Sequence, residues 1–250
     1  RICSFFHFGV SFLFKGYLFF RYLRLIRTII LFFIILINFS FSANAHLEHY
    51  DDLNRIEFDI YRNGKNIGKH IFTFKRSDDE LSVISEINFQ IKKFGVVLYK
   101  YNAEGTEIFK EGKLIKFNSK TNQNGKHKYV NMKLENNEYN VDGSSYKGKV
   151  PFEFQLGTWW NHSIIKAPAQ ISAVSGRIIH QKVTFIGKET IKIGEKNFKS
   201  LHFNFSSTDK KLSKGKRLNT DVWYDEKSLN WIKASFDKKG KWEYRLISIK

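Results

Sequence analysis

Four adjacent residues combine large apolar surfaces with hydrogen-bonding groups: Trp159, Trp160, Asn161 and His162. Two indoles beside an amide and an imidazole are typical of a concave site for an apolar or amphiphilic ligand. They lie in a stretch, residues 151–176, that lacks the strand alternation found elsewhere in the chain. The same tryptophans would also suit the open end of a barrel as core residues, because loop tryptophans are commonly buried. The sequence leaves both interpretations open.

His70 is a second candidate for a ligand contact. It alternates with Phe72 and Phe74, so the three side chains are predicted to share the inner face of one strand. A histidine on an inner face is more often a satisfied core group than a ligand or a general base. His202, next to Phe203, has the opposite parity and is predicted to face solvent.

A weaker candidate is a copper site at the mature N-terminus. Cleavage of a signal peptide after Ala45 would give His46 a free α-amine beside its imidazole, and His49 and Asp51 follow within reach of a metal ion. No second rigid ligand can be identified, so we expect no resident metal. We expect no cofactor either, since the sequence has no phosphate-cradling glycine loop.

Signatures of enzymes are missing from the sequence. It contains no Gly-x-Ser-x-Gly elbow and no His-Glu-x-x-His motif. A glycan hydrolase that uses two carboxyl groups stays an alternative, with Glu86, Glu104 and Glu107 as candidates. Their spacing does not separate them from surface carboxylates, so we assign no catalytic residue and favour a protein without catalytic activity.

The elements that must position these residues are strands. Ile56, Phe58 and Ile60 alternate with polar residues, and Asn63-Gly64 supplies the positive φ angles of a tight hairpin. Further strands are predicted over residues 81–91, 96–110, 114–123, 127–135, 138–142, 178–186, 188–193, 197–207, 220–225, 229–237 and 241–249. The pattern predicts an all-β fold, an antiparallel meander that forms a barrel or a strongly curved sheet.

Two segments interrupt the strand pattern. Residues 151–176 are predicted to form a crossover with a short helix over 159–166, capped by Thr158 and ended before Pro168. Residues 209–218 are polar and lysine-rich, which predicts a loop.

Residues 21–45 have the composition of a secretion signal. Arg21, Arg24 and Arg27 precede the apolar run 28–41, and a small-x-small cleavage site ends at Ala45. The 14-residue apolar run is shorter than the about 20 residues that a bilayer span needs. We therefore expect cleavage after Ala45 and export, in the first instance to the periplasm. An uncleaved membrane anchor is the alternative.

The predicted organisation follows from this signal. Residues 1–20 are interpreted as an upstream extension outside the fold, and residues 46–53 as a flexible mature N-terminus. Residues 54–250 are expected to form a single β domain. Cys3 is the only cysteine, so the mature domain is expected to have neither a disulfide nor thiol chemistry.

The chain is strongly basic. Its formal net charge is +18, and residues 46–250 carry +13, because five of the 42 Lys and Arg and none of the 24 Asp and Glu precede residue 46. Such an excess attracts anionic surfaces, so peripheral contact with an acidic envelope surface is one expectation. The alternative is that scattered lysines at turns keep a β protein soluble and blunt its edges. Export argues against nucleic acid as a partner, and the sequence does not define the oligomeric state.

Five short motifs occur in a fixed order. They are Tyr-Arg-Asn-Gly-Lys-Asn-Ile-Gly over 61–68, His-Ile-Phe-Thr-Phe over 70–74, residues 97–101, Gly-Thr-Trp-Trp-Asn over 157–161 and Asp-Val-Trp-Tyr-Asp over 221–225. In this order they resemble an exported proteobacterial family, domain of unknown function 6134, over most of residues 54–249. A looser similarity to domain of unknown function 3108 points to the same fold. The resemblance implies an envelope β domain and implies no catalytic residues.

The function that these observations favour is a periplasmic binding or scaffolding protein without catalytic activity. It would hold an apolar or amphiphilic, lipid-like molecule in a β cavity bordered by Trp159 and Trp160. One alternative is an outer-membrane β-barrel, although Arg55, Glu57 and Asp59 would then place charges where lipid requires apolar groups. The other is the envelope enzyme acting on glycan.

Overall fold

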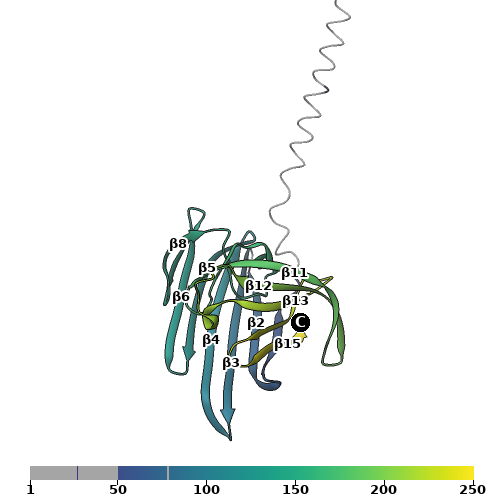
Figure 1. Cartoon of the computed structure of the whole chain (residues 1–250). Helices are drawn as coiled ribbons and strands as arrows, with labels where there is room; N and C mark the ends of the chain where they lie inside the picture. Colours follow the sequence, from purple (N-terminus) through teal and green to yellow (C-terminus); the bar gives the residue numbers. More distant parts are fainter. Residues whose placement is uncertain (1–26, 28–49, 78) are drawn as a thin grey trace, which may run out of the picture. The chain divides into compact units, whose positions relative to one another are not determined.

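The computed structural model describes Arg27 and residues 50–77 and 79–250. His46–Lys250 is one compact unit, and its architecture is shown in Figure 1. No helix in the described part of the chain is long and apolar enough to cross a membrane. The candidate copper ligands His46 and His49 lie outside the described residues.

The described residues form a sheet of 15 strands, which confirms the predicted all-β fold. The strands are β1 (Arg55–Arg62), β2 (Lys65–Ser77), β3 (Glu80–Lys93), β4 (Val96–Lys110), β5 (Lys113–Gln123), β6 (Lys126–Glu135), β7 (Glu138–Gly143), β8 (Lys147–Pro151), β9 (Gln155–Leu156), β10 (Ala169–Ile171), β11 (Ile178–Ile193), β12 (Lys196–Ser207), β13 (Asn219–Asp225), β14 (Trp231–Asp237) and β15 (Lys241–Ile249). Neighbours in the sequence are neighbours in the sheet, except that β8 and β9 are not paired and that β1 pairs with β15. All pairs of the described sheet are antiparallel except β9 with β10, so the sheet is for the most part the antiparallel meander that the sequence predicts.

The sheet is strongly curved rather than closed. Its order runs from β8 through β1 and β15 to β9, so β8 and β9 are the two ends of the described sheet. Figure 1 shows β11, β12 and β13 lying across the N-terminal strands. One apolar core includes residues from both halves, such as Met132 of β6 and Phe205 of β12, so the curvature encloses it.

The local sequence explains the first hairpin. Ile56, Phe58 and Ile60 are fully buried while the residues between them are partly exposed, as the period of two predicts. Asn63 and Gly64 have φ angles of 50° and 76°, which matches the tight turn expected at this dipeptide. The Phe58 ring stacks on Trp231 of β14 with centroids 3.9 Å apart, which ties the two halves of the sheet together.

The crossover contains a short helix, but it begins later than predicted. It is a 3-10 helix, η2 (His162–Lys166), and its cap is Asn161, whose side chain accepts a hydrogen bond from the Ser163 N–H. Trp159 has a φ angle of +60°, a left-handed conformation that no right-handed helix contains. The predicted helix over 159–166 with a Thr158 cap is therefore wrong in its first three residues.

The segment before β1 is packed rather than free. Tyr50 is fully buried, and its hydroxyl oxygen lies 2.7 Å from Nδ1 of His162 and accepts the His162 backbone N–H at 3.0 Å. The Arg76 guanidinium donates to the carbonyl oxygens of Tyr50 and Leu53. Tyr50 and Leu53 belong to the segment 46–53 that is predicted to be flexible, and both are buried in the core.

The register of β1 yields a matched pair of substitutions. Phe58→Asp should lower the free energy of unfolding by more than about 4 kcal/mol, because it removes a buried ring and leaves an unpaired carboxylate in the core. Glu57→Lys should change it by less than about 1 kcal/mol, because Glu57 is partly exposed and its ion pair with Arg55 lies at the surface. Denaturant unfolding of both variants measures the difference. Equal losses would contradict the register.

Candidate functional site

The two adjacent tryptophans of the crossover have different environments. Trp160 is fully buried, and its ring makes edge contacts with Tyr50, Phe74 and Phe109 at centroid distances of 5.1, 5.2 and 5.6 Å. Its indole N–H donates to Oε1 of Glu107 at 2.8 Å. Trp160 is therefore a core residue and does not border an opening, unlike the role the sequence suggests for it.

The polar residues that follow are also used within the fold. Asn161 caps η2, and His162 is buried with Nδ1 against the Tyr50 hydroxyl. His70 is buried as well, on the same face as Phe72, and its Nε2 lies 2.9 Å from the Ser85 hydroxyl oxygen. Burial lowers the pKa of His70 to about 3, so its imidazole is neutral at physiological pH. None of the three contributes to an open site.

Trp159 is the residue of the predicted cluster that borders a cleft. Its carbonyl oxygen accepts a hydrogen bond from the Tyr224 hydroxyl at 3.0 Å, which holds the left-handed backbone turn in place. Its ring packs edge-on against Trp231 and Tyr244. Its buried indole nitrogen has no hydrogen-bond partner among the described residues. A buried donor without an acceptor costs about 1–3 kcal/mol.

The cleft next to this tryptophan has a volume of about 650 Å³, and we call it the Trp159 cleft. Besides Trp159, its apolar surface comes from Ile179, Leu218 and Phe236. Its charged side chains are four cations and one acid: Arg177, Lys216, Arg217, Lys238 and Asp237. The arrangement is a partly apolar pocket whose charged lining is mainly basic.

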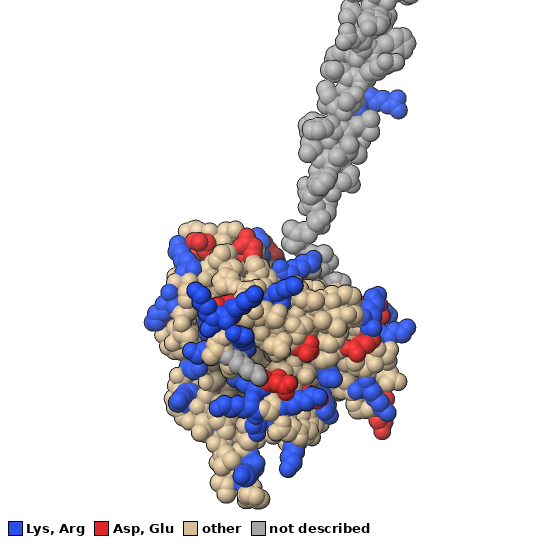
Figure 2. Space-filling view, viewed as in Figure 1, with Lys and Arg blue, Asp and Glu red and all other residues tan. Residues whose placement is uncertain are grey.

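The Trp159 cleft contains more positive than negative charge. Burial lowers the pKa of Lys238, and the positive charges of Arg177 and Lys128 lower it further. Arg177 donates to the Lys216 carbonyl oxygen at 3.1 Å, which uses one of its five N–H groups and neutralises no charge. On the face of the domain shown in Figure 2, Lys and Arg side chains cover more of the surface than Asp and Glu side chains do. A bound anion would relieve this repulsion.

Three separate segments supply the cations of the Trp159 cleft. The turn after β10 supplies Arg177, the loop before β13 supplies Lys216 and Arg217, and the turn after β14 supplies Lys238. The Arg217 side chain donates to the carbonyl oxygens of Leu212 and Lys210, so it also holds its loop together. These residues are far from Trp159 in the sequence. Pattern reasoning missed them because each reads as an ordinary turn or loop cation.

The three candidate carboxylates of a hydrolase do not converge. Glu86 and Glu104 face each other on β3 and β4 and are exposed, whereas Glu107 is 2% exposed and points into the core. Burial raises the pKa of Glu107 to about 7, although hydrogen bonds from Trp160 and Thr158 oppose the shift. Within the described residues no group of His, Cys, Asp and Glu could hold a metal ion.

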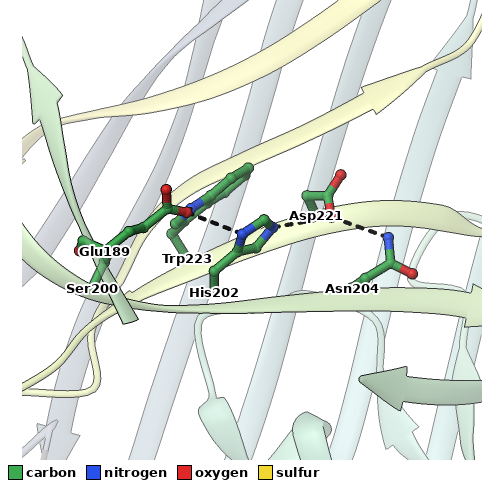
Figure 3. A network of polar contacts seen from close by, with 6 residues as sticks. All are labelled: Glu189, Ser200, His202, Asn204, Asp221 and Trp223. Atoms are coloured by element: carbon green, nitrogen blue, oxygen red, sulfur yellow. Dashed lines mark hydrogen bonds and ion pairs between the residues drawn. The ribbon is translucent and has the colours of Figure 1, made fainter. Parts of the chain in front are cut away.

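A polar network covers the outer face of β11–β13, as Figure 3 shows. His202 lies 3.0 Å from Glu189 and 3.1 Å from Asp221, and its ring stacks on Trp223 with centroids 4.2 Å apart. The His202 side chain is 17% exposed, so the solvent-facing position predicted for it is largely covered by its partners. Ser200 donates to the Glu189 backbone carbonyl. The network links three strands and contains no free nucleophile.

A substitution at Glu107 tests whether the ionisation of this buried carboxyl group destabilises the fold. Its pKa is higher in the folded than in the unfolded state, so stability present below pH 4.5 is lost as the pH rises to about 7. Glu107→Gln keeps an acceptor for the Trp160 N–H and never ionises. Between pH 5 and pH 8 the variant should gain about 3 kcal/mol in free energy of unfolding relative to the wild type. Denaturant unfolding at both pH values measures this.

The matched control is Glu111→Gln, at an exposed turn. It should follow the wild type at both pH values, because its carboxylate stays in water. Parallel pH profiles for Glu107→Gln and the wild type would contradict the buried charge.

A solved structure has a fold similar to that of this chain. The chain is similar to the crystal structure of a beta-barrel-like protein of domain of unknown function DUF1849 from Brucella abortus, with a TM-score of 0.56 and 10% sequence identity. The match covers 79% of this chain and 98% of that chain, and at this identity it concerns the fold alone. No curated protein matches this chain. The family model described as Domain of unknown function (DUF6134) matches residues 58–247, most of the β domain, and the chain therefore belongs to this family.

Proposed function

We propose that this protein is an exported, non-catalytic binding protein that holds an anionic amphiphile in the Trp159 cleft. The observation that carries the proposal is the composition of that cleft, an apolar surface together with four cations and one acid. Its volume of about 650 Å³ lies within the range of small-molecule sites, roughly 300–1,000 Å³.

The apolar residues and the charged residues of the cleft suit different parts of the proposed ligand. Trp159, Leu218 and Phe236 offer apolar surface, on which each buried methylene contributes about 0.8 kcal/mol. Arg177 and Lys238 offer charge-assisted hydrogen bonds for an acidic head group. An uncharged lipid would leave the repulsion around Lys238 in place, so the acidic amphiphile is favoured over a neutral one.

A direct test uses dansyl-undecanoic acid and its methyl ester as matched probes. The acid should bind saturably, and the ester about tenfold more weakly, since a hydrogen bond to a charged group contributes about 1.5–3 kcal/mol. Arg177→Gln combined with Lys238→Gln should reduce binding of the acid about tenfold or more and leave binding of the ester unchanged. Fluorescence titration measures all four affinities.

The control is Lys192→Gln combined with Lys196→Gln, which removes two exposed positive charges from the β11–β12 hairpin, outside the cleft. It should bind the acid as the wild type does. Equal losses in both double variants would mean that the net charge, not the cleft, attracts the probe. Absence of saturable binding to the folded wild type would refute the proposal.

Export is a separate part of the proposal and has its own test. The arginines before residue 28, the short apolar run 28–41 and the small-x-small site at Ala45 support cleavage. N-terminal sequencing of protein recovered from a periplasmic extract should begin at His46. Recovery from membranes alone, with the apolar run intact, would support an anchored protein instead.

A further inference from the structure

The β3–β4 hairpin ends in an apolar tip. Phe94 is 94% exposed, and Val96, Val97 and Leu98 are 63%, 46% and 55% exposed. Of the exposed large hydrophobic residues in the described part of the chain, half belong to this one turn. In Figure 1 β3 and β4 extend to the lower end of the domain, where Figure 2 shows a largely tan projection that carries blue side chains and no red ones. We call residues 94–98 the hairpin tip.

The turn itself does not require an aromatic residue. Phe94 and Gly95 have φ angles of 51° and 80°, the left-handed pair that tight hairpins use. The equivalent first positions of other hairpins in the chain include Asn63, Glu111, Asn124 and Asn136, all of them polar, and asparagine tolerates this conformation well. A phenylalanine at such a position is strained and adds apolar surface in water. Its presence therefore needs an explanation outside the turn.

The tip is apolar on both sides of the hairpin. Successive side chains in a strand point to opposite faces, and Val96, Val97 and Leu98 are consecutive and all exposed. A globular partner or a second copy docked on one face would leave the other face in water. A bilayer, by contrast, surrounds a projecting tip on all sides.

Positive charge surrounds the base of the hairpin tip. Lys92, Lys93 and Lys100 flank it, and residues 88–102 contain no Asp or Glu. The Lys93 ammonium lies over the Phe94 ring at 5.5 Å, so the two side chains point the same way. In general a lysine can bury its methylenes against apolar surface while its charged end stays in water or among polar groups.

A groove of about 440 Å³ lies beside this hairpin. Lys65, Lys92 and Lys100 line it together with side-chain amides, among them Asn88 and Asn102, and its lining contains no acid. The Asn102 amide donates to the Asn88 side-chain oxygen, which fixes the groove wall. Ammonium and amide donors are suited to the phosphate oxygens of lipid head groups.

We infer that the hairpin tip inserts into a bilayer of acidic phospholipids, with the lysines of the groove contacting the head-group phosphates. Lys92 lies two residues from Phe94, and Lys100, which pairs with Gln90, lies about four residue rises from it, so the separation along the hairpin is roughly 7–13 Å. Phe94 would then reach below the head groups while these two lysines stay at their level. Each lysine near an acidic surface adds about fivefold to the affinity. The inference does not depend on the Trp159 cleft, so either can fail alone.

The test places an environment-sensitive label at the tip of the full chain. Cys3→Ser removes the only cysteine, and Phe94→Cys then carries a nitrobenzoxadiazole group. With vesicles of phosphatidylglycerol and phosphatidylcholine the emission should shift to the blue, and with phosphatidylcholine alone it should not. The same label on Lys113→Cys, at the start of β5 and opposite the far end of β4, should stay in water.

Charge variants test the role of the lysines. Lys92→Gln, Lys93→Gln and Lys100→Gln together should weaken the vesicle titration about one hundredfold. Lys192→Gln, Lys196→Gln and Lys199→Gln remove the same charge from the exposed β11–β12 hairpin and should weaken it far less. Because all six lysines are at the surface of strands or turns, circular dichroism is expected to show folded protein in both cases.

Three outcomes would overturn the inference. An unshifted label at position 94 in acidic vesicles would exclude insertion. An equal shift in both kinds of vesicle, or equal losses in the two triple variants, would exclude recognition of acidic lipid by these lysines. A shift without vesicles that grows with protein concentration would assign the hairpin tip to a contact between copies of the chain.

Discussion

The ladder between β1 and β15 is the interaction on which the rest of the structure depends. It joins the first and last strands, and the N–H groups of Asn54 and Arg55 both donate to the carbonyl oxygen of Lys250. Without it the N-terminal and C-terminal meanders would be two sheets with additional open edges. With it they form one curved sheet whose inner faces share a core, as the Phe58–Trp231 stack illustrates.

An enclosed core of this kind sets the chemistry of the groups inside it. Trp160 enters from the crossover and brings its N–H to Glu107, while His70 lies among aromatic rings. Desolvation shifts the two pKa values in opposite directions, upward for the acid and downward for the base. Both groups therefore favour their neutral forms, and the folded state is penalised by Glu107 at high pH and by His70 at low pH.

The distribution of charge carries more information than its sum. The net charge of +18 is equally compatible with scattered solubilising lysines and with binding to anions. The folded chain gathers cations beside apolar surface at two places, the Trp159 cleft and the hairpin tip. The first is concave and suits a single amphiphile, whereas the second projects and suits a surface. These shapes separate the two proposals even though the chemistry of their ligands is alike.

The sequence by itself determined most of the strands, the tight turns and the side of the sheet that residues such as Phe58 and His70 face, whereas β8, β9 and β10 were not predicted. These features depend on a period of two and on dipeptides such as Asn63-Gly64, which act over a few residues. Only the tertiary structure decided which features came together. Trp159 and Trp160 have different environments because the backbone at Trp159 has a left-handed φ angle. The cations of the Trp159 cleft come from loops and turns near three different strands. Burial and clefts arise from contacts between residues remote in sequence, about which a local pattern carries no information.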